Sequence, residues 1–257
     1  MLPGASPARI HYREHGPPDG APLLVLHGGW GYAFYPFDPQ IAALPGHRII
    51  APDRTGYGRS PRITALPPRF HHAAAAEHEA VADALGLERY AIWGHSDGAI
   101  IALLMAMRRP ARVTRVIVEA VHLDREKPRS RAFFTQMRDA PDGFGPKVTG
   151  KLVADHGEDY WRSVLHAGGR AWLDIAATPG DDFYQVDGRG LDSIACPVLA
   201  IHGVDDPRTE PGELDRLQRE VPGIAMHWVT GGGHAPHSER HVSAEVTHVG
   251  TSFLRDS

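Results

Sequence analysis

The chain has 257 residues, one cysteine, 42% hydrophobic and 23% charged residues, and a formal net charge of −4. This length suits one large α/β domain, and the slight negative charge gives no general attraction to nucleic acid or to an anionic membrane. The strongly apolar stretch Gly98–Met107 is shorter than the roughly 20 residues of a membrane-spanning helix. Because the first residues also lack the apolar run of a secretory signal, we expect a cytoplasmic protein with no nucleic-acid or membrane partner.

Short runs rich in Val, Ile and Leu alternate along the chain with longer segments of helical composition. This alternation predicts a mostly parallel central sheet flanked by helices. In chain order, strands are predicted at Ala8–Glu14 (an edge strand), Pro22–Leu26, Arg48–Ala51, Tyr90–Trp93, Val113–Glu119, Pro197–Ile201 and Ala225–Val229. Helices are predicted at Phe70–Leu85, Ala99–Met107, Pro211–Arg219 and Ser238–Leu254.

The alternation stops between residues 122 and 194, where aromatic, glycine and charged residues mix. We predict a helical cap over 122–194, inserted into a core formed by 1–121 and 195–257. Three or four short helices are expected, separated at Pro141–Gly143, Gly168–Gly169 and Pro179–Gly180. A long disordered loop is the alternative, but the segment contains large side chains that need packing partners, namely Trp161, Trp172, Phe183 and Tyr184.

The segment Gly94–Gly98, GHSDG, lies directly between a predicted strand and the apolar helix that follows it. It matches the G-x-S-x-G pattern, in which a sharp turn exposes the serine hydroxyl and requires glycine on both sides. This context predicts that Ser96 is a nucleophile. A serine that only caps the helix is the simpler alternative.

A serine hydroxyl is a weak nucleophile unless a base accepts its proton and a third group orients that base. His234 follows three glycines after the last predicted strand, and we predict that it is the base; His237 is the second candidate. Asp205 and Asp206 both follow the strand that ends near Ile201, and either could orient the imidazole.

The negative oxygen that forms during acyl transfer needs backbone N–H donors. We predict an oxyanion hole formed by the amides of Asp97, next to the nucleophile, and of Gly29, within the glycine-rich segment His27–Gly31. An ordinary turn is the alternative reading of that segment. Trp30 and the cap residue Trp161 are candidate substrate-binding residues in an apolar pocket.

Three histidines, His71, His72 and His78, lie close together in one predicted helix and raise the question of a metal site. No set of carboxylates or thiolates accompanies them, so solvated helix positions are the preferred interpretation. We expect no metal and no cofactor.

These motifs, with Asp53–Ser60, resemble the α/β-hydrolase superfamily over essentially all of the chain outside the cap, and the order Ser, Asp, His is the same. The resemblance implies the α/β-hydrolase fold, and it implies that Asp53–Ser60 is a structural turn. In most relatives the acid stands three residues after the glycine of its turn, which selects Asp206 over Asp205. The implied function is hydrolysis of a small carboxylic ester through an acyl-enzyme by Ser96, His234 and Asp206.

A weaker resemblance, carried by Ser96–Gly98 and Gly157–Trp161, is to valacyclovirase-like amino-acid ester hydrolases. It implies that Asp97 helps to bind a substrate ammonium group. The simpler alternative is that Asp97 occupies the first turn of a helix, where negative charge is favourable. The chain departs from that pattern at Ala99, where a second glycine often stands, and at Trp30.

The same triad could open a lactone, cleave an amide or a carbon–carbon bond, or support perhydrolysis, and the fold does not separate these reactions. Epoxide hydrolase and dehalogenase chemistry is disfavoured, because those enzymes use aspartate where this chain has Ser96. A small-molecule receptor that retains the pocket is the alternative from a different class. The substrate is expected to be a small molecule, and the sequence leaves the oligomeric state open.

Overall fold

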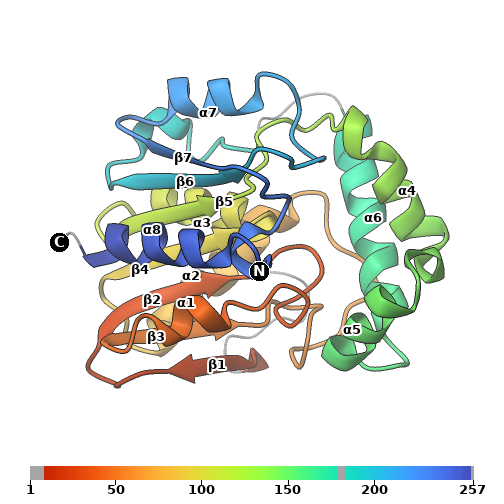
Figure 1. Ribbon diagram of the computed structural model, residues 1–257, viewed down its shortest axis with the longest axis horizontal. Coiled ribbons are helices and arrows are strands. Elements are labelled where there is room, and N and C mark those ends of the chain that lie inside the picture. The colour runs from red at the N-terminus through yellow and green to blue at the C-terminus, as the bar shows by residue number, and fades with distance from the viewer. Residues whose placement is uncertain (1–8, 179–182, 256–257) are drawn as a thin grey trace.

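The computed structural model describes residues 9–178 and 183–255. Its centre is a seven-stranded sheet in the spatial order β1-β3-β2-β4-β5-β6-β7 (Figure 1). β1 runs antiparallel to β3, and the other neighbouring strands are parallel. The prediction of a mostly parallel sheet is confirmed. The strands are β1 (Tyr12–His15), β2 (Ala21–Leu26), β3 (His47–Pro52), β4 (Tyr90–His95), β5 (Val113–Glu119), β6 (Val198–Gly203) and β7 (Ala225–Val229).

Helices cover both faces of the sheet, and the strands bury apolar side chains on each face in turn. On β2, Leu24 and Leu26 pack toward one helical layer while Leu23 and Val25 pack toward the other. The first layer contains α2 (Phe70–Ala84), α3 (Asp97–Arg108) and α7 (Glu213–Glu220). The second contains α8 (Ser243–Arg255) and the short α1 (Asp38–Ala42), a helix that the sequence did not predict.

The segment between β5 and β6 contains α4 (Arg131–Asp139), α5 (Pro146–His156) and α6 (Trp161–Ala177), which lie together beyond the ends of the strands (Figure 1). The predicted break at Gly168–Gly169 is wrong, because α6 continues through both glycines. Here glycine serves close helix packing, since a Cβ at Gly169 would lie 2.5 Å from the carbonyl oxygen of Phe134 in α4. The predicted break at Pro179–Gly180 lies outside the described residues. Within the described part of the chain, no helix has the length and apolarity needed to cross a membrane.

We expect Gly169→Ala to destabilise the protein by about 1–3 kcal/mol, because the added methyl group overpacks the contact between α4 and α6. Gly150→Ala is the matched control: Gly150 lies in α5 with nothing within 4 Å of an added Cβ. That control should stabilise the fold by about 0.5–1 kcal/mol through helix propensity. Thermal unfolding followed by circular dichroism compares the two variants, and equal shifts in Tm would contradict the packing argument.

Candidate active site

Ser96 lies in the sharp turn between β4 and α3. Its backbone φ is +54°, a left-handed value that costs an L-residue about 1–3 kcal/mol. A Cβ at Gly94 would lie 2.2 Å from the carbonyl oxygen of Gly98, and a Cβ at Gly98 would lie 2.1 Å from that of Leu26. The turn therefore requires both glycines of the motif.

The structure brings Ser96, His234 and Asp206 together from three separate loops. Nε2 of His234 lies 3.1 Å from Oγ of Ser96, and Nδ1 lies 2.9 Å from Oδ2 of Asp206. The other carboxylate oxygen of Asp206 accepts a hydrogen bond from the backbone amide of Arg208, at 2.9 Å. Ser96, His234 and Asp206 are 8, 9 and 7% exposed, so the chain of hydrogen bonds is almost completely shielded from water.

The two rival candidates lie elsewhere. The Asp205 side chain is exposed to solvent. His237 is fully buried, with Nδ1 in contact with a carboxylate oxygen of Glu119 and Nε2 3.0 Å from the carbonyl oxygen of Tyr35. The backbone amide of His237 also donates to Glu119, at 3.1 Å. His237 therefore attaches the turn that follows His234 to the end of β5, and it makes no hydrogen bond to Ser96.

The electrostatics suit a neutral base beside an ionised acid. Burial first, and the positive charge of Arg208 second, lower the pKa of His234 below its ordinary value of 6.5. Burial alone would raise the pKa of Asp206, but the neighbouring His234 and the amide of Arg208 outweigh it, so that this pKa is lowered. Near neutral pH the imidazole can accept a proton, and the carboxylate can stabilise the imidazolium that results.

The predicted oxyanion donors, Gly29 and Asp97, both line the pocket that contains Ser96. As the first residue of α3, Asp97 has no acceptor for its backbone N–H within the helix. The buried guanidinium of Arg54 connects the two segments. It donates to the carbonyl oxygens of His27 and Gly28 at 3.2 and 3.4 Å, and to the Asp97 carboxylate at 2.8 Å. Sequence reasoning assigned Arg54 no role.

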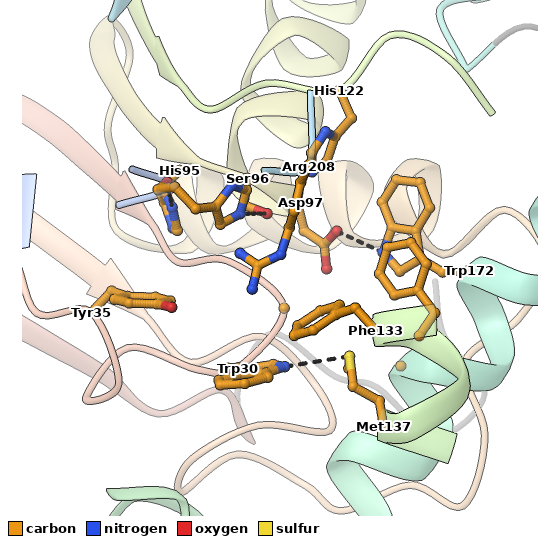
Figure 2. Close-up of a pocket in the computed structure, with 14 residues that line it drawn as sticks. Trp30, Tyr35, His95, Ser96, Asp97, His122, Phe133, Met137, Trp172 and Arg208 are labelled. Atoms are coloured by element: carbon orange, nitrogen blue, oxygen red, sulfur yellow. Dashed lines mark hydrogen bonds between the residues drawn. The ribbon is translucent and has the colours of Figure 1, made fainter. Parts of the chain in front are cut away.

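The carboxylate of Asp97 is enclosed by partners from within the protein. Besides Arg54, Nε2 of His71 donates to Oδ1 at 3.3 Å. Nε1 of Trp172 donates to the same oxygen at 3.2 Å (Figure 2). Burial alone would raise the pKa of Asp97, but His71 and Arg54 outweigh it and lower this pKa. Asp97 therefore remains ionised and links the nucleophile's helix to α2 and α6.

The interpretation of the three helical histidines as solvated is wrong for two of them. His71 and His78 are buried on the inner face of α2, and His72 is partly buried. Burial lowers the pKa of all three, that of His78 to about 3. The periodicity of α2 turns two of these positions toward the core, where His71 serves Asp97.

The pocket around Ser96 is walled mainly by aromatic side chains (Figure 2). Trp30 lines it and stacks on Phe133 with 5.4 Å between ring centroids. Trp161 does not line it and is 1% exposed; it begins α6, about 16 Å along the helix from Trp172, which does line the pocket. No local sequence pattern indicates the other lining residues: Tyr35, His95, His122, Phe133, Phe134, Met137, Gly168, Trp172 and Arg208.

Three buried side chains behind Ser96, those of His95, Glu119 and His237, offer potential metal-ligand atoms within 4.8 Å of one another. Both ring nitrogens of His237 already contact oxygen atoms of the protein. Nε2 of His95 donates to the carbonyl oxygen of His234 at 2.8 Å. These contacts position the His234 loop, and a metal ion would have to break them.

Comparison with known proteins identifies the family. Residues 23–246 match the family described as the alpha/beta hydrolase family. A haloalkane dehalogenase from Mycolicibacterium paratuberculosis is 28% identical over 85% of this chain and 78% of its own length. Serine hydrolase BPHL from Mus musculus is 27% identical over 89% of this chain and 77% of its own. The solved structure of a thermophilic esterase from Thermogutta terrifontis aligns with a TM-score of 0.72 at 21% identity, over 98% of this chain and 96% of that one.

The mostly parallel sheet, covered on both faces and carrying a strand–serine–helix turn, defines an α/β-hydrolase fold. The chain belongs to the alpha/beta hydrolase family. The resemblance seen in the motifs is thereby confirmed, and these relatives support hydrolase activity on a small molecule. Their names cover several chemistries, so they do not fix the substrate.

Proposed function

We propose that this protein hydrolyses a small carboxylic ester through an acyl-enzyme. Ser96 Oγ attacks the ester carbonyl carbon while His234 Nε2 accepts its proton, and Asp206 stabilises the imidazolium. The tetrahedral intermediate collapses as the imidazolium protonates the departing alcohol. Water then attacks the acyl-enzyme with His234 as base, and release of the carboxylic acid regenerates Ser96. The observation that carries this proposal is the continuous hydrogen-bond chain from Ser96 through His234 to Asp206.

The oxyanion would accept hydrogen bonds from the amides of Gly29 and Asp97, each worth roughly 3–4 kcal/mol of transition-state stabilisation. Residues 122–194 would act as the cap that excludes water, on a core of 1–121 and 195–257. In support, α4 and α6 supply five residues that line the pocket: Phe133, Phe134, Met137, Gly168 and Trp172.

A preference for amino-acid esters is not part of this proposal. The Asp97 carboxylate already forms an ion pair with Arg54 in which both side chains are buried. A substrate ammonium would have to compete with that guanidinium. Asp97 is better explained as a structural link between α2, α3 and α6.

A turnover screen tests the function, using 4-nitrophenyl esters of short acids, amino-acid esters and simple lactones. We expect turnover of the 4-nitrophenyl esters, and no advantage for an ester with a free amine over its N-acetyl counterpart. Turnover of lactones alone would transfer the proposal to that reaction. If the folded protein turned over none of these compounds, the result would contradict the proposal and favour the alternative that the protein is a small-molecule receptor.

The pH profile provides a separate test. We expect kcat/KM for a neutral ester to fall in acidic solution with a half-maximal point below pH 6.5. The acid limb reports protonation of the base in the free enzyme, and the pKa of His234 lies below 6.5, so the neutral imidazole persists to lower pH. Initial rates measured as a function of pH check the prediction, and a half-maximal point above pH 6.5 would contradict it.

A further inference from the structure

We propose that Arg208 binds a carboxylate of the substrate, so that the favoured esters carry a negative charge near the bond that is cleaved. This inference rests on the proposed esterase function and names a substrate class for the same pocket. Arg208 lies two residues after Asp206, and its backbone amide donates a hydrogen bond to the Asp206 carboxylate. The half-buried side chain extends into the pocket, where the guanidinium points between Tyr35 and Phe133 (Figure 2).

Of the two charged side chains that line the pocket, Asp97 has a partner of opposite charge among the described residues and Arg208 does not. The histidines that line the pocket have pKa values lowered by burial, so Asp97 and Arg208 are the lining residues with a full charge at neutral pH. The charge of Asp97 is matched by Arg54. In the part of the chain that the structure describes, no carboxylate lies within ion-pair distance of the Arg208 side chain.

The nearby acids are committed elsewhere. Asp206 lies behind the imidazole of His234, does not line the pocket, and uses both carboxylate oxygens in hydrogen bonds. The carboxylate of Glu239 accepts the backbone amides of Gly233 and Ala235 at 2.8 and 3.1 Å, on either side of His234.

The surroundings of Arg208 favour a flat anion. Its guanidinium carbon lies 4.1 Å from the centroid of the Phe133 ring, and Trp30 stacks on the same ring. Arginine offers five N–H donors in a planar fork that fits both oxygens of a carboxylate, and such pairs are stronger where water is excluded. An arginine that only rests on an aromatic ring is the simpler explanation.

The pocket beside Arg208 is small. The cavity has a volume of about 40 Å³, little more than one water molecule occupies. Substrate entry therefore requires side chains to move, and the half-buried arginine Arg208 is one of the side chains that line the pocket.

Two pairs of esters that differ only in charge test the proposal. In one pair the charge is on the acyl side: 4-nitrophenyl hydrogen adipate and its terminal carboxamide. In the other it is on the leaving group: 4-acetoxybenzoate and 4-acetoxybenzamide. For at least one pair we expect kcat/KM to favour the anion by about tenfold or more. Arg208→Gln should bring that ratio close to one, whereas Arg131→Gln should preserve it, because Arg131 is exposed on α4 outside the pocket.

Equal rates within both pairs for the wild-type protein, or a preference that survives Arg208→Gln, would overturn the role of Arg208 while leaving esterase activity intact. Absence of turnover would count against the esterase proposal, and a binding measurement then decides the role of Arg208. Calorimetric titration of the Ser96→Ala variant with 4-acetoxybenzoate and 4-acetoxybenzamide should show tighter binding of the anion. Adding Arg208→Gln should remove the difference, and equal binding of the two compounds before that change would overturn the proposal.

Discussion

Replacing Ser96 with alanine is expected to lower kcat for a 4-nitrophenyl ester by on the order of 10⁴- to 10⁶-fold. Alanine removes the oxygen that would form the acyl-enzyme, and His234 would then have no hydroxyl to activate. Steady-state kinetics with highly purified protein measures the loss. The variant should fold normally, because Ser96 contributes no side-chain cap to α3 and its Cβ is retained.

Ser163→Ala provides the matched control, since Ser163 is an exposed serine of α6. Its kcat should stay close to that of the wild-type protein. If Ser96→Ala kept a tenth or more of the wild-type kcat with an unchanged circular dichroism spectrum, Ser96 would not be the nucleophile.

Asp206→Asn is expected to lower kcat by about 10⁴-fold. Asparagine has nearly the same shape as aspartate, but it has no charge with which to stabilise the imidazolium. Its amide group can also donate to Nδ1 of His234, which favours the tautomer that cannot accept the serine proton. The effect should appear mainly in kcat.

The adjacent Asp205→Asn is the control for this experiment, because the same change is made at an exposed side chain. We expect kcat within about twofold of the wild-type value, as is usual for surface substitutions away from a site. If the Asp205 variant lost activity and the Asp206 variant kept it, the assignment of the acid would be reversed.

The sequence predicted the features that local patterns determine. Each central strand is an apolar run bounded by turn residues, so the seven strands could be placed within a few residues. The turn around Ser96 could be recognised because its geometry demands glycine at 94 and 98. His234 could be selected because it follows a glycine-rich turn at the carboxyl edge of the sheet.

The rest depends on contacts between distant parts of the chain. The hydrogen bond from Trp172 to Asp97 spans 75 positions, and that from Arg54 to Asp97 spans 43. No local pattern indicates that these groups meet. The sequence therefore favours Trp161 as a pocket residue, whereas Trp172 is the tryptophan of α6 that lines the pocket. Gly169 could be read as a helix break because the neighbour that requires it, Phe134, lies on another helix. No sequence pattern singles out Arg208. Only the folded structure shows that, among the described residues, no carboxylate lies within ion-pair distance of its side chain.

The central claim, that Ser96 is an activated nucleophile, is tested most directly by labelling with a fluorophosphonate and intact-protein mass spectrometry. Such reagents react with serines that an adjacent base activates and leave ordinary serines unmodified. We predict one adduct per chain, located on Ser96 by peptide mapping and absent from the Ser96→Ala variant. No adduct on folded wild-type protein, or an adduct that persists after Ser96 is replaced, would contradict the proposed mechanism.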